Sequence, residues 1–282
     1  MAAGSAHAAP PPHPWTGEGF IERAAGRIHY VEMGPKDSSR EPLILLHKLG
    51  GWVDDWAAVA PMLAKDRRVI AMDLPGHGES TMRGPPPYVQ TAAESAAMLK
   101  AALDEMGLSQ VCLVGCSLGG VTGVMMASFW PSFVRRLALI SVSLSALRPY
   151  SALPAMDAEI RSNFGPNWEP IARSNASVDR FGSVDPRINA DANRSRAKAG
   201  VWVRPSERGV AVAGTDDYLP RVEAPTLLIY ADRGLYTRWE TVGRSRLRDV
   251  TIAHIAGTGS FTHQEKPAET AVVLNRFLGA PA

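Results

Sequence analysis

The chain has 282 residues, 45% of them hydrophobic, which suffices for one sizeable domain with a substantial core and room for an inserted subdomain. Its 30 basic and 28 acidic residues are spread along the sequence and leave a formal net charge of +2. That balance lacks the basic stripe that nucleic acid or an anionic membrane surface selects, so neither partner is expected.

Residues 1–18 are rich in Ala, Pro, Gly and His, and they lack the basic start and apolar run of a signal peptide. We expect a disordered tail there. No later stretch reaches the roughly 18 uninterrupted apolar residues of a membrane helix. Cys112 and Cys116 stand four positions apart without metal-ligand spacing around them, which favours buried thiols. The sequence therefore predicts a cytoplasmic protein with neither metal nor cofactor, and it leaves the oligomeric state open.

After the tail, short apolar runs alternate with longer helical patterns, which is typical of a mostly parallel sheet covered on both faces. The expected elements, in chain order, are strands at 27–33, 43–46 and 69–72, a helix at 90–107, a strand at 111–114, a helix at 121–129, strands at 137–142 and 226–230, a helical stretch to 247, a strand at 250–255 and a helix at 268–278.

The alternation breaks between residues 145 and 214, where Arg, Asn, Pro and Trp are scattered without a strand-like run. We therefore divide the chain into a core of 19–144 and 215–282 and a lid subdomain of 145–214. The lid lies between the sixth and seventh core strands. The fold class is α/β, with a doubly wound sheet.

A G-x-S-x-G motif is centred on Ser117, between the apolar strand run and a small, apolar helix. This context is that of a nucleophile elbow, a tight strand-to-helix turn that lifts a serine hydroxyl above the edge of the sheet. Ser117 is therefore the first candidate catalytic residue.

Three further segments accompany the elbow in order: Leu-Leu-His-Lys-Leu-Gly-Gly at 45–51, Asp-Leu-Pro-Gly-His-Gly-Glu-Ser at 73–80, and Gly-Thr-Gly-Ser-Phe-Thr-His-Gln-Glu-Lys-Pro at 257–267. With these motifs the chain resembles the α/β-hydrolase superfamily, in its branch of small bacterial esterases, epoxide hydrolases and carbon–carbon bond hydrolases. The resemblance covers about residues 20–278. It implies an oxyanion hole formed by the backbone N–H groups of Leu49 and Leu118.

The same resemblance exposes three departures. Ser260 stands where the family usually carries the general-base His, and Gly234 stands where it carries the Asp that orients this His. Lys48 replaces a Gly of the oxyanion segment. Since a serine hydroxyl is a weak nucleophile without a base, ordinary triad hydrolysis is not expected, although the oxyanion hole would remain.

Lys48 is the departure that adds a reactive group. In a dry pocket its pKa would fall, so that Lys48 could serve as a base or amine nucleophile in a dyad with Ser117; the alternative is a stem along the surface with the ammonium in water. Ser117 itself is either a working residue or a relic of the elbow. His263 is a possible substitute base, although a structural histidine on the rim is favoured.

Within the lid, Trp168 and Trp202 are candidates for lining a substrate pocket, and the lid arginines for meeting an anionic group. The alternative is that the aromatic rings pin the lid to the core while the arginines are solvated. As a set, the aromatic residues favour an aromatic or polycyclic small molecule.

These observations predict an atypical enzyme acting on a carbonyl-bearing small molecule through the oxyanion hole, Ser117 and Lys48. The chemistry would be that of a lyase, a cyclisation, a decarboxylation or a slow ester or lactone hydrolysis. Two alternatives stay open: a binding protein that kept the pocket and lost the chemistry, and an engineered triad variant of an esterase.

Overall fold

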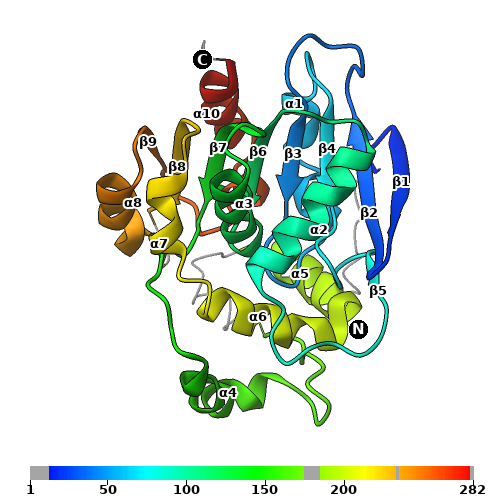
Figure 1. Cartoon of the computed structure of the whole chain (residues 1–282), viewed down its shortest axis with the longest axis vertical. Coiled ribbons are helices and arrows are strands. Elements are labelled where there is room, and N and C mark those ends of the chain that lie inside the picture. The colour runs from blue at the N-terminus through cyan, green and yellow to red at the C-terminus, as the bar shows by residue number, and fades with distance from the viewer. Residues whose placement is uncertain (1–12, 175–184, 233–234, 280–282) are drawn as a thin grey trace, which may run out of the picture.

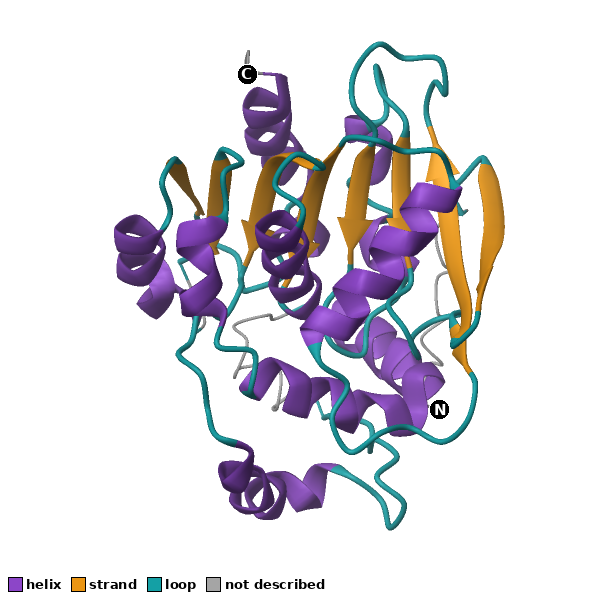
Figure 2. Ribbon diagram, viewed as in Figure 1, coloured by secondary structure: helices purple, strands orange, loops and turns teal. Residues whose placement is uncertain are grey.

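The computed structural model describes residues 13–174, 185–232 and 235–279, and its centre is a twisted sheet with helices on both faces (Figures 1 and 2). The sheet has nine strands in the order β1-β2-β4-β3-β6-β7-β8-β9, and β5 pairs with β2. The strands are β1 Gly17–Arg23, β2 Gly26–Met33, β3 Leu43–Leu46, β4 Val69–Met72, β5 Thr81–Met82, β6 Val111–Cys116, β7 Val134–Ile140, β8 Thr226–Ala231 and β9 Val250–Ile255.

From β4 through β9 the neighbouring strands are parallel, whereas β1, β2 and β5 pair antiparallel at one edge. Every residue of β3, β4, β6 and β8 is buried, as expected for strands covered on both faces. This arrangement confirms the predicted α/β fold class.

One apolar cluster fills each side of the sheet. The first contains residues of α2 Ala92–Glu105 and α3 Leu118–Phe129, and the second contains residues of α1 Ala60–Leu63 and α10 Pro267–Gly279. A capping box starts α2: the Glu94 N–H donates to Thr91 Oγ1 (3.1 Å) and the Thr91 N–H donates to Glu94 Oε2 (2.9 Å). The remaining core helices are α8 Glu240–Arg246 and α9 Thr262–Glu265.

The prediction of a disordered tail over residues 1–18 is wrong for the last residues of that range. Residues 1–12 lie outside the described residues, but β1 already begins at Gly17 and pairs with β2 along its whole length. Glu18 in that strand contacts His29 Nε2 at 2.9 Å, and Trp15 donates to Asp54 at 3.1 Å. An edge strand with every second residue exposed has too few apolar positions to stand out in the sequence.

The described part of the segment between β7 and β8 contains four α-helices. It contains α4 Leu153–Ile160, α5 Pro186–Ala199, α6 Val203–Ala211 and α7 Thr215–Tyr218. α5 begins with Asp185, which accepts the Arg187 N–H, and Pro186 in its first turn. The apolar pattern is weak because α6 buries charged residues, among them Arg204 and Arg208. Figure 1 places α4, α5 and α6 beyond the carboxyl ends of the strands.

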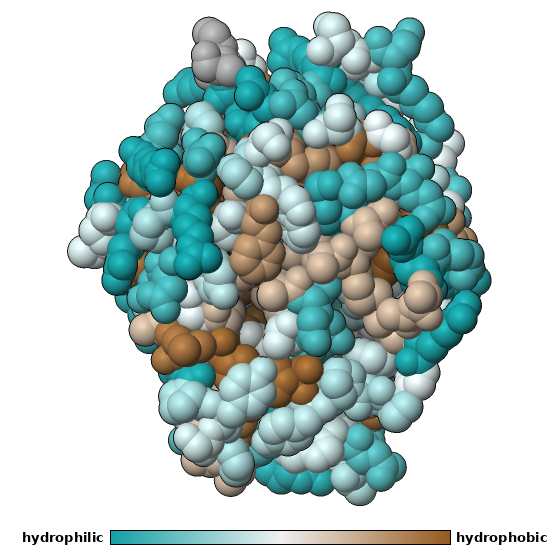
Figure 3. All heavy atoms as spheres, viewed as in Figure 1, coloured by the Kyte–Doolittle hydropathy of each residue, from teal (hydrophilic) through white to brown (hydrophobic). Residues whose placement is uncertain are grey.

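The surface in Figure 3 is mostly hydrophilic, with a patch of hydrophobic side chains on the left of its lower half, near the level of α6. Among the described residues of the segment between β7 and β8, the exposed large hydrophobic side chains are Leu147, Tyr150 and Ile171. Within the described ranges, no helix has the length and the apolar run needed to cross a membrane.

Candidate active site

Ser117 lies at the turn between β6 and α3 with a φ of 48°, a left-handed backbone that residues other than glycine rarely adopt. Glycine surrounds this turn because nothing larger fits. A Cβ on Gly119 would lie 2.2 Å from the carbonyl oxygen of Leu46, and one on Gly115 would lie 2.5 Å from that of Gly119. The sequence therefore builds the strained elbow that the motif predicts.

Two backbone N–H groups are free beside the elbow. Leu46 of β3 is paired in register with Gly115 of β6, so the chain after β3 passes next to the serine turn. The Gly119 N–H donates to the His47 carbonyl at 3.0 Å and ties the two segments together. In the part of the chain that the structure describes, no acceptor is found for the N–H groups of Leu49 and Leu118. These are the two groups expected from the sequence to form an oxyanion hole, and that role stays a prediction.

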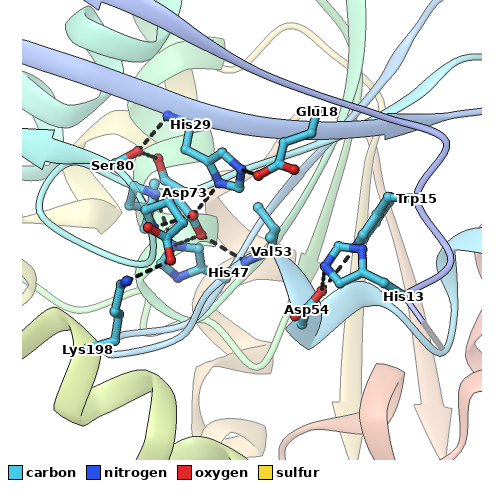
Figure 4. A network of polar contacts seen from close by, with 12 residues as sticks. His13, Trp15, Glu18, His29, His47, Val53, Asp54, Asp73, Ser80 and Lys198 are labelled. Atoms are coloured by element: carbon cyan, nitrogen blue, oxygen red, sulfur yellow. Dashed lines mark hydrogen bonds and ion pairs between the residues drawn. The ribbon is translucent and has the colours of Figure 1, made fainter. Parts of the chain in front are cut away.

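A buried polar network holds the loops behind this hole (Figure 4). Asp73 accepts from the Val53 N–H (2.8 Å), from the Glu79 N–H (2.9 Å) and from His29 Nδ1 (2.7 Å). Burial alone would lower the pKa of His29, but its carboxylate partners Asp73 and Glu18 raise it above the usual value. The network is structural, because it connects β2, the loop after β3 and the loop after β4.

His47 belongs to the same support. Its Nε2 accepts from the Leu74 N–H at 2.9 Å, and its Nδ1 lies 2.7 Å from the Lys48 carbonyl, which makes Nδ1 the protonated nitrogen. Burial lowers the pKa of His47, so the ring stays neutral.

Of the two positions at which the family carries the triad His and Asp, the structure describes only that of Ser260. Ser260 is buried, with 1% of its surface exposed, at the place where the resemblance puts a histidine. Gly234 lies outside the described residues. Asp232 is exposed and accepts from the N–H groups of Gly257 (2.8 Å) and Thr258 (3.2 Å), so its carboxylate shapes the loop before Ser260.

Lys48 is buried and forms an ion pair with Asp55. Its Nζ lies 2.7 Å from Asp55 Oδ1, and the side chains expose 6% and 0% of their surfaces. The amine also lies 5.0 Å from the centre of the Phe261 ring. The alternative of a solvated lysine is therefore wrong, because the stem points inward. Asp55 was missed in the sequence, although an inward lysine requires a counter-charge and Trp-Val-Asp-Asp-Trp at 52–56 offers one.

His263 is fully buried, and among the described residues neither ring nitrogen has a hydrogen-bond partner. Its ring packs on Trp56 at 4.3 Å between centroids. Burial, and then the Lys48 charge, lower the pKa of His263 well below its usual value. It does not lie on the rim, and a role as substitute base stays a prediction.

Arg196 of α5 lies directly over the oxyanion segment. A Cβ on Gly50 would lie 2.5 Å from Arg196 Cγ, so the stem crosses the glycine at contact distance. The residue is 5% exposed, and its Nε and Nη2 have no hydrogen-bond partner in the described residues. Burial, and then the charge of Arg173, lower the pKa of Arg196 to about 10. Residues 145–214 contain nine arginines and one lysine, and the sequence alone does not show which of these side chains are buried.

Both candidate tryptophans pack against protein. Trp202 lies against Gly76 in the loop after β4, where a Cβ would meet its ring at 2.5 Å. Trp168 packs 5.6 Å from the Phe164 ring, beneath the guanidinium groups of Arg161 (4.7 Å) and Arg208 (5.2 Å). That either also lines a substrate pocket stays a prediction.

The insert is joined to the core next to this site. Lys198 pairs with Glu79 at 2.6 Å, and the Gln90 N–H donates to the Pro205 carbonyl at 3.0 Å. Leu49 packs both on the main core and on the insert cluster that contains Phe164. Among the described residues, no group of three or more His, Cys, Asp or Glu is placed to bind a metal ion.

The model of one protein family, described as the alpha/beta hydrolase fold, matches residues 41–266 of this chain. The matched segment contains the first three motifs and all but the last residue of the fourth.

Two curated relatives, both from Pseudomonas putida, are similar over about half of the chain. The dihydrolipoyllysine-residue acetyltransferase component of the acetoin cleaving system is 34% identical over 142 residues, which are 50% of this chain and 36% of that protein. The 2-hydroxy-6-oxononadienedioate/2-hydroxy-6-oxononatrienedioate hydrolase 1 is 30% identical over 135 residues, 45% of each chain. The alignments thus span less than half of either relative.

Solved structures are similar over nearly the whole chain. The enol-lactonase from Burkholderia xenovorans LB400 has a TM-score of 0.78 at 18% identity, covering 93% of this chain and 100% of the other. A membrane phospholipase A, described as a bacterial virulence factor, has a TM-score of 0.74 at 22% identity, covering 93% and 86%. At these identities the likeness shows the fold alone.

Proposed function

This chain belongs to the α/β-hydrolase fold family, and from that premise we propose that it is an enzyme acting on a small molecule that bears a carbonyl group and a carboxylate. The carbonyl oxygen would accept from the N–H groups of Leu49 and Leu118, with Ser117 and Lys48 beside it. The reaction would be a lyase step, a cyclisation, a decarboxylation or a slow ester or lactone hydrolysis, without the Ser-His-Asp triad.

The observation that carries this proposal is the buried Arg196 side chain, whose stem crosses Gly50 and whose Nε and Nη2 have no hydrogen-bond partner among the described residues. A buried cation without a partner costs free energy, and a carboxylate that accepts from its free nitrogens removes that cost. Because Arg196 touches the oxyanion segment, such a carboxylate would lie close to a carbonyl group held by the two free N–H groups.

Three further observations support the substrate class, a role for Ser117 and the location of the protein. The hydrolase from Pseudomonas putida, which is 30% identical over 135 residues, is named for an oxo-dienedioate or oxo-trienedioate, a compound with an oxo group and two carboxylates. A strained elbow also costs about 1–3 kcal/mol of backbone strain, which a site without any role for Ser117 would not need. The free, buried thiols of Cys112 and Cys116 fit a cytoplasmic location.

Ligand binding tests the proposal without knowledge of the natural substrate. We expect phenylpyruvate and related 2-oxo acids to raise the melting temperature of the protein, whereas their methyl esters do not. Arg196→Met should weaken this binding roughly ten-fold or more, as expected for lost charge-assisted hydrogen bonds. Arg194→Met is the matched control, because Arg194 is exposed on the same helix and pairs with Asp191.

Turnover then separates an enzyme from a binding protein. Carboxylates that bind should be screened for conversion by mass spectrometry, with Ser117→Ala as the reference. Binding that depends on Arg196 without any conversion would favour the binding protein. Equal binding of acids and esters would contradict the proposed substrate class.

A further inference from the structure

Asp55 lies outside the four motifs, yet among the described residues it alone forms an ion pair with the Lys48 amine. It lies in the 3-10 turn η1 Val53–Trp56, fully buried. Its Oδ2 occupies the place of a missing side chain, because a Cβ on Gly51 would lie 2.1 Å from it. Gln264 reaches Asp55 Oδ1 only at 3.4 Å. The geometry therefore aims this carboxylate at Lys48.

Two observations relate the pair to the segments that carry Ser117 and Ser260. Phe261, whose ring centre is 5.0 Å from Lys48 Nζ, directly follows Ser260. Cys116 directly precedes Ser117, and it feels the charges of both Lys48 and Asp55. The Lys48 side chain therefore contacts the residue that follows Ser260, and its charge acts on the residue that precedes Ser117.

The other titratable groups around the pair do not carry a compensating charge. Burial holds His263 and His47 neutral by lowering the pKa of each, and burial raises the pKa of Cys116 to about 12. Asp191 acts on Asp55 only through its charge. Burial also raises the pKa of Asp55, while the Lys48 ammonium opposes that rise. His47 and Asp191 therefore act electrostatically on Asp55, and Lys48 acts on Cys116 and His263.

We propose that Asp55 is a positioning residue that keeps Lys48 in its ammonium form, so that Lys48 works as a fixed positive charge and not as a base or nucleophile. An isolated ammonium in a dry interior loses its proton, whereas a carboxylate at 2.7 Å offsets the lost hydration. A fixed cation beside the free N–H groups would stabilise negative charge that develops on a bound carbonyl oxygen. This inference rests on the proposed function for its benefit to catalysis, but its chemical content does not depend on a substrate.

Nuclear magnetic resonance of lysine-labelled protein measures this content directly. We expect the 15Nζ resonance of Lys48, assigned by its loss in Lys48→Met, to keep the ammonium shift between pH 6 and 9. In Asp55→Asn the same resonance should move to the neutral amine within that range. Asp54→Asn, which alters the half-buried carboxylate next to Asp55 in the chain, should leave the Lys48 resonance unchanged.

A second measurement links the protonation state to the site. A fluorophosphonate should label Ser117 slowly in the unaltered protein, as mass spectrometry reports. Asp55→Asn should label roughly 10²-fold faster above neutral pH, because the freed amine becomes a general base. Asp55→Glu should restore the slow rate, and Lys48→Met/Asp55→Asn should remove the gain. A carboxylate that is merely structural would not produce an increase.

A neutral Lys48 in the unaltered protein, or an Asp55→Asn variant whose Lys48 stays charged, would overturn the inference. If Asp55→Asn does not fold, the first of these two results still decides. Failure of 2-oxo acids to bind would count against the proposed function and leave the protonation state of Lys48 untouched.

Discussion

Lys48 Nζ and Asp55 Oδ1 lie 2.7 Å apart inside the protein, and this contact decides how Lys48 must be tested. Removing one partner of a buried pair leaves an uncompensated charge, which costs about 3–5 kcal/mol. We expect Lys48→Met to lower the free energy of unfolding by that amount, so that a loss of activity alone is ambiguous.

The double variant resolves the ambiguity. Lys48→Met/Asp55→Leu removes both charges and keeps the volume, so most of the stability should return, to within about 2 kcal/mol of the unaltered protein. Urea unfolding measures each variant, and Arg40→Met is the control for an exposed pair, that of Arg40 with Asp66, with an expected cost below about 1 kcal/mol. A stable single variant would mean that Lys48 and Asp55 do not depend on each other. Activity should be compared in the double variant.

A second prediction restores the family pattern. Lys48→Gly, Asp55→Asn, Gly234→Asp and Ser260→His together should place a histidine and its acid beside Ser117. Hydrolysis of p-nitrophenyl acetate should then rise at least roughly 10²-fold.

Asp55 is included in that set because it would otherwise lose its partner. The same set with Ser117→Ala is the reference for background hydrolysis. A folded variant without esterase activity would show that positions 234 and 260 are misaligned with the triad.

The third prediction concerns pH. Burial lowers the pKa of His77 to about 3 and that of His263 well below 6.5, whereas both rings take up protons near pH 6.5 in the unfolded chain. Acid therefore favours unfolding, and below about pH 6 the two rings should cost roughly 2.7 kcal/mol per pH unit. His29, with its raised pKa, acts with the opposite sign and only above pH 6.5.

Urea unfolding between pH 5 and 8 measures this slope. His263→Phe should remove about one proton of the difference between the folded and unfolded states. An unaltered slope in His263→Phe would mean that this ring is not held neutral.

The fourth prediction concerns α4, which Figure 1 shows apart from the sheet. Asp157 on α4 accepts from Arg204 Nε at 2.8 Å and from Arg208 Nη2 at 2.7 Å, and so joins α4 to α6. Burial alone would raise the pKa of Asp157, but hydrogen bonds from Arg208 and Arg204 lower it. Asp157→Asn should speed tryptic cleavage within residues 141–174 roughly ten-fold, whereas Asp104→Asn, at an exposed pair, should not. Equal cleavage rates would show that other contacts hold α4.

The core could be predicted from the sequence because its strands are short apolar runs between clear breaks. The expected strands 43–46, 69–72 and 250–255 match the structure in both bounds. The insert could not be predicted in the same way, since Arg204 and Arg208 are buried by pairing with Asp157, and burial by pairing leaves no apolar period.

Some residues of the candidate site could likewise be predicted from local sequence motifs, whereas others could not. Ser117 and the free N–H groups of Leu49 and Leu118 follow from local backbone geometry, which the glycines encode in the motif itself. Asp55 and Arg196 depend on contacts between distant segments, and only the fold brings them to Lys48 and Gly50.

The glycines at 50 and 76 receive Arg196 and Trp202 of the insert at distances that leave no space for a methyl group. The insert and the receiving loops of the core are therefore sterically complementary at these two contacts. Transplanting the insert of another family member onto this core would require exchanging the receiving loops as well. In a shuffled library, we expect functional chimeras to keep 50 with 196 and 76 with 202 from the same parent.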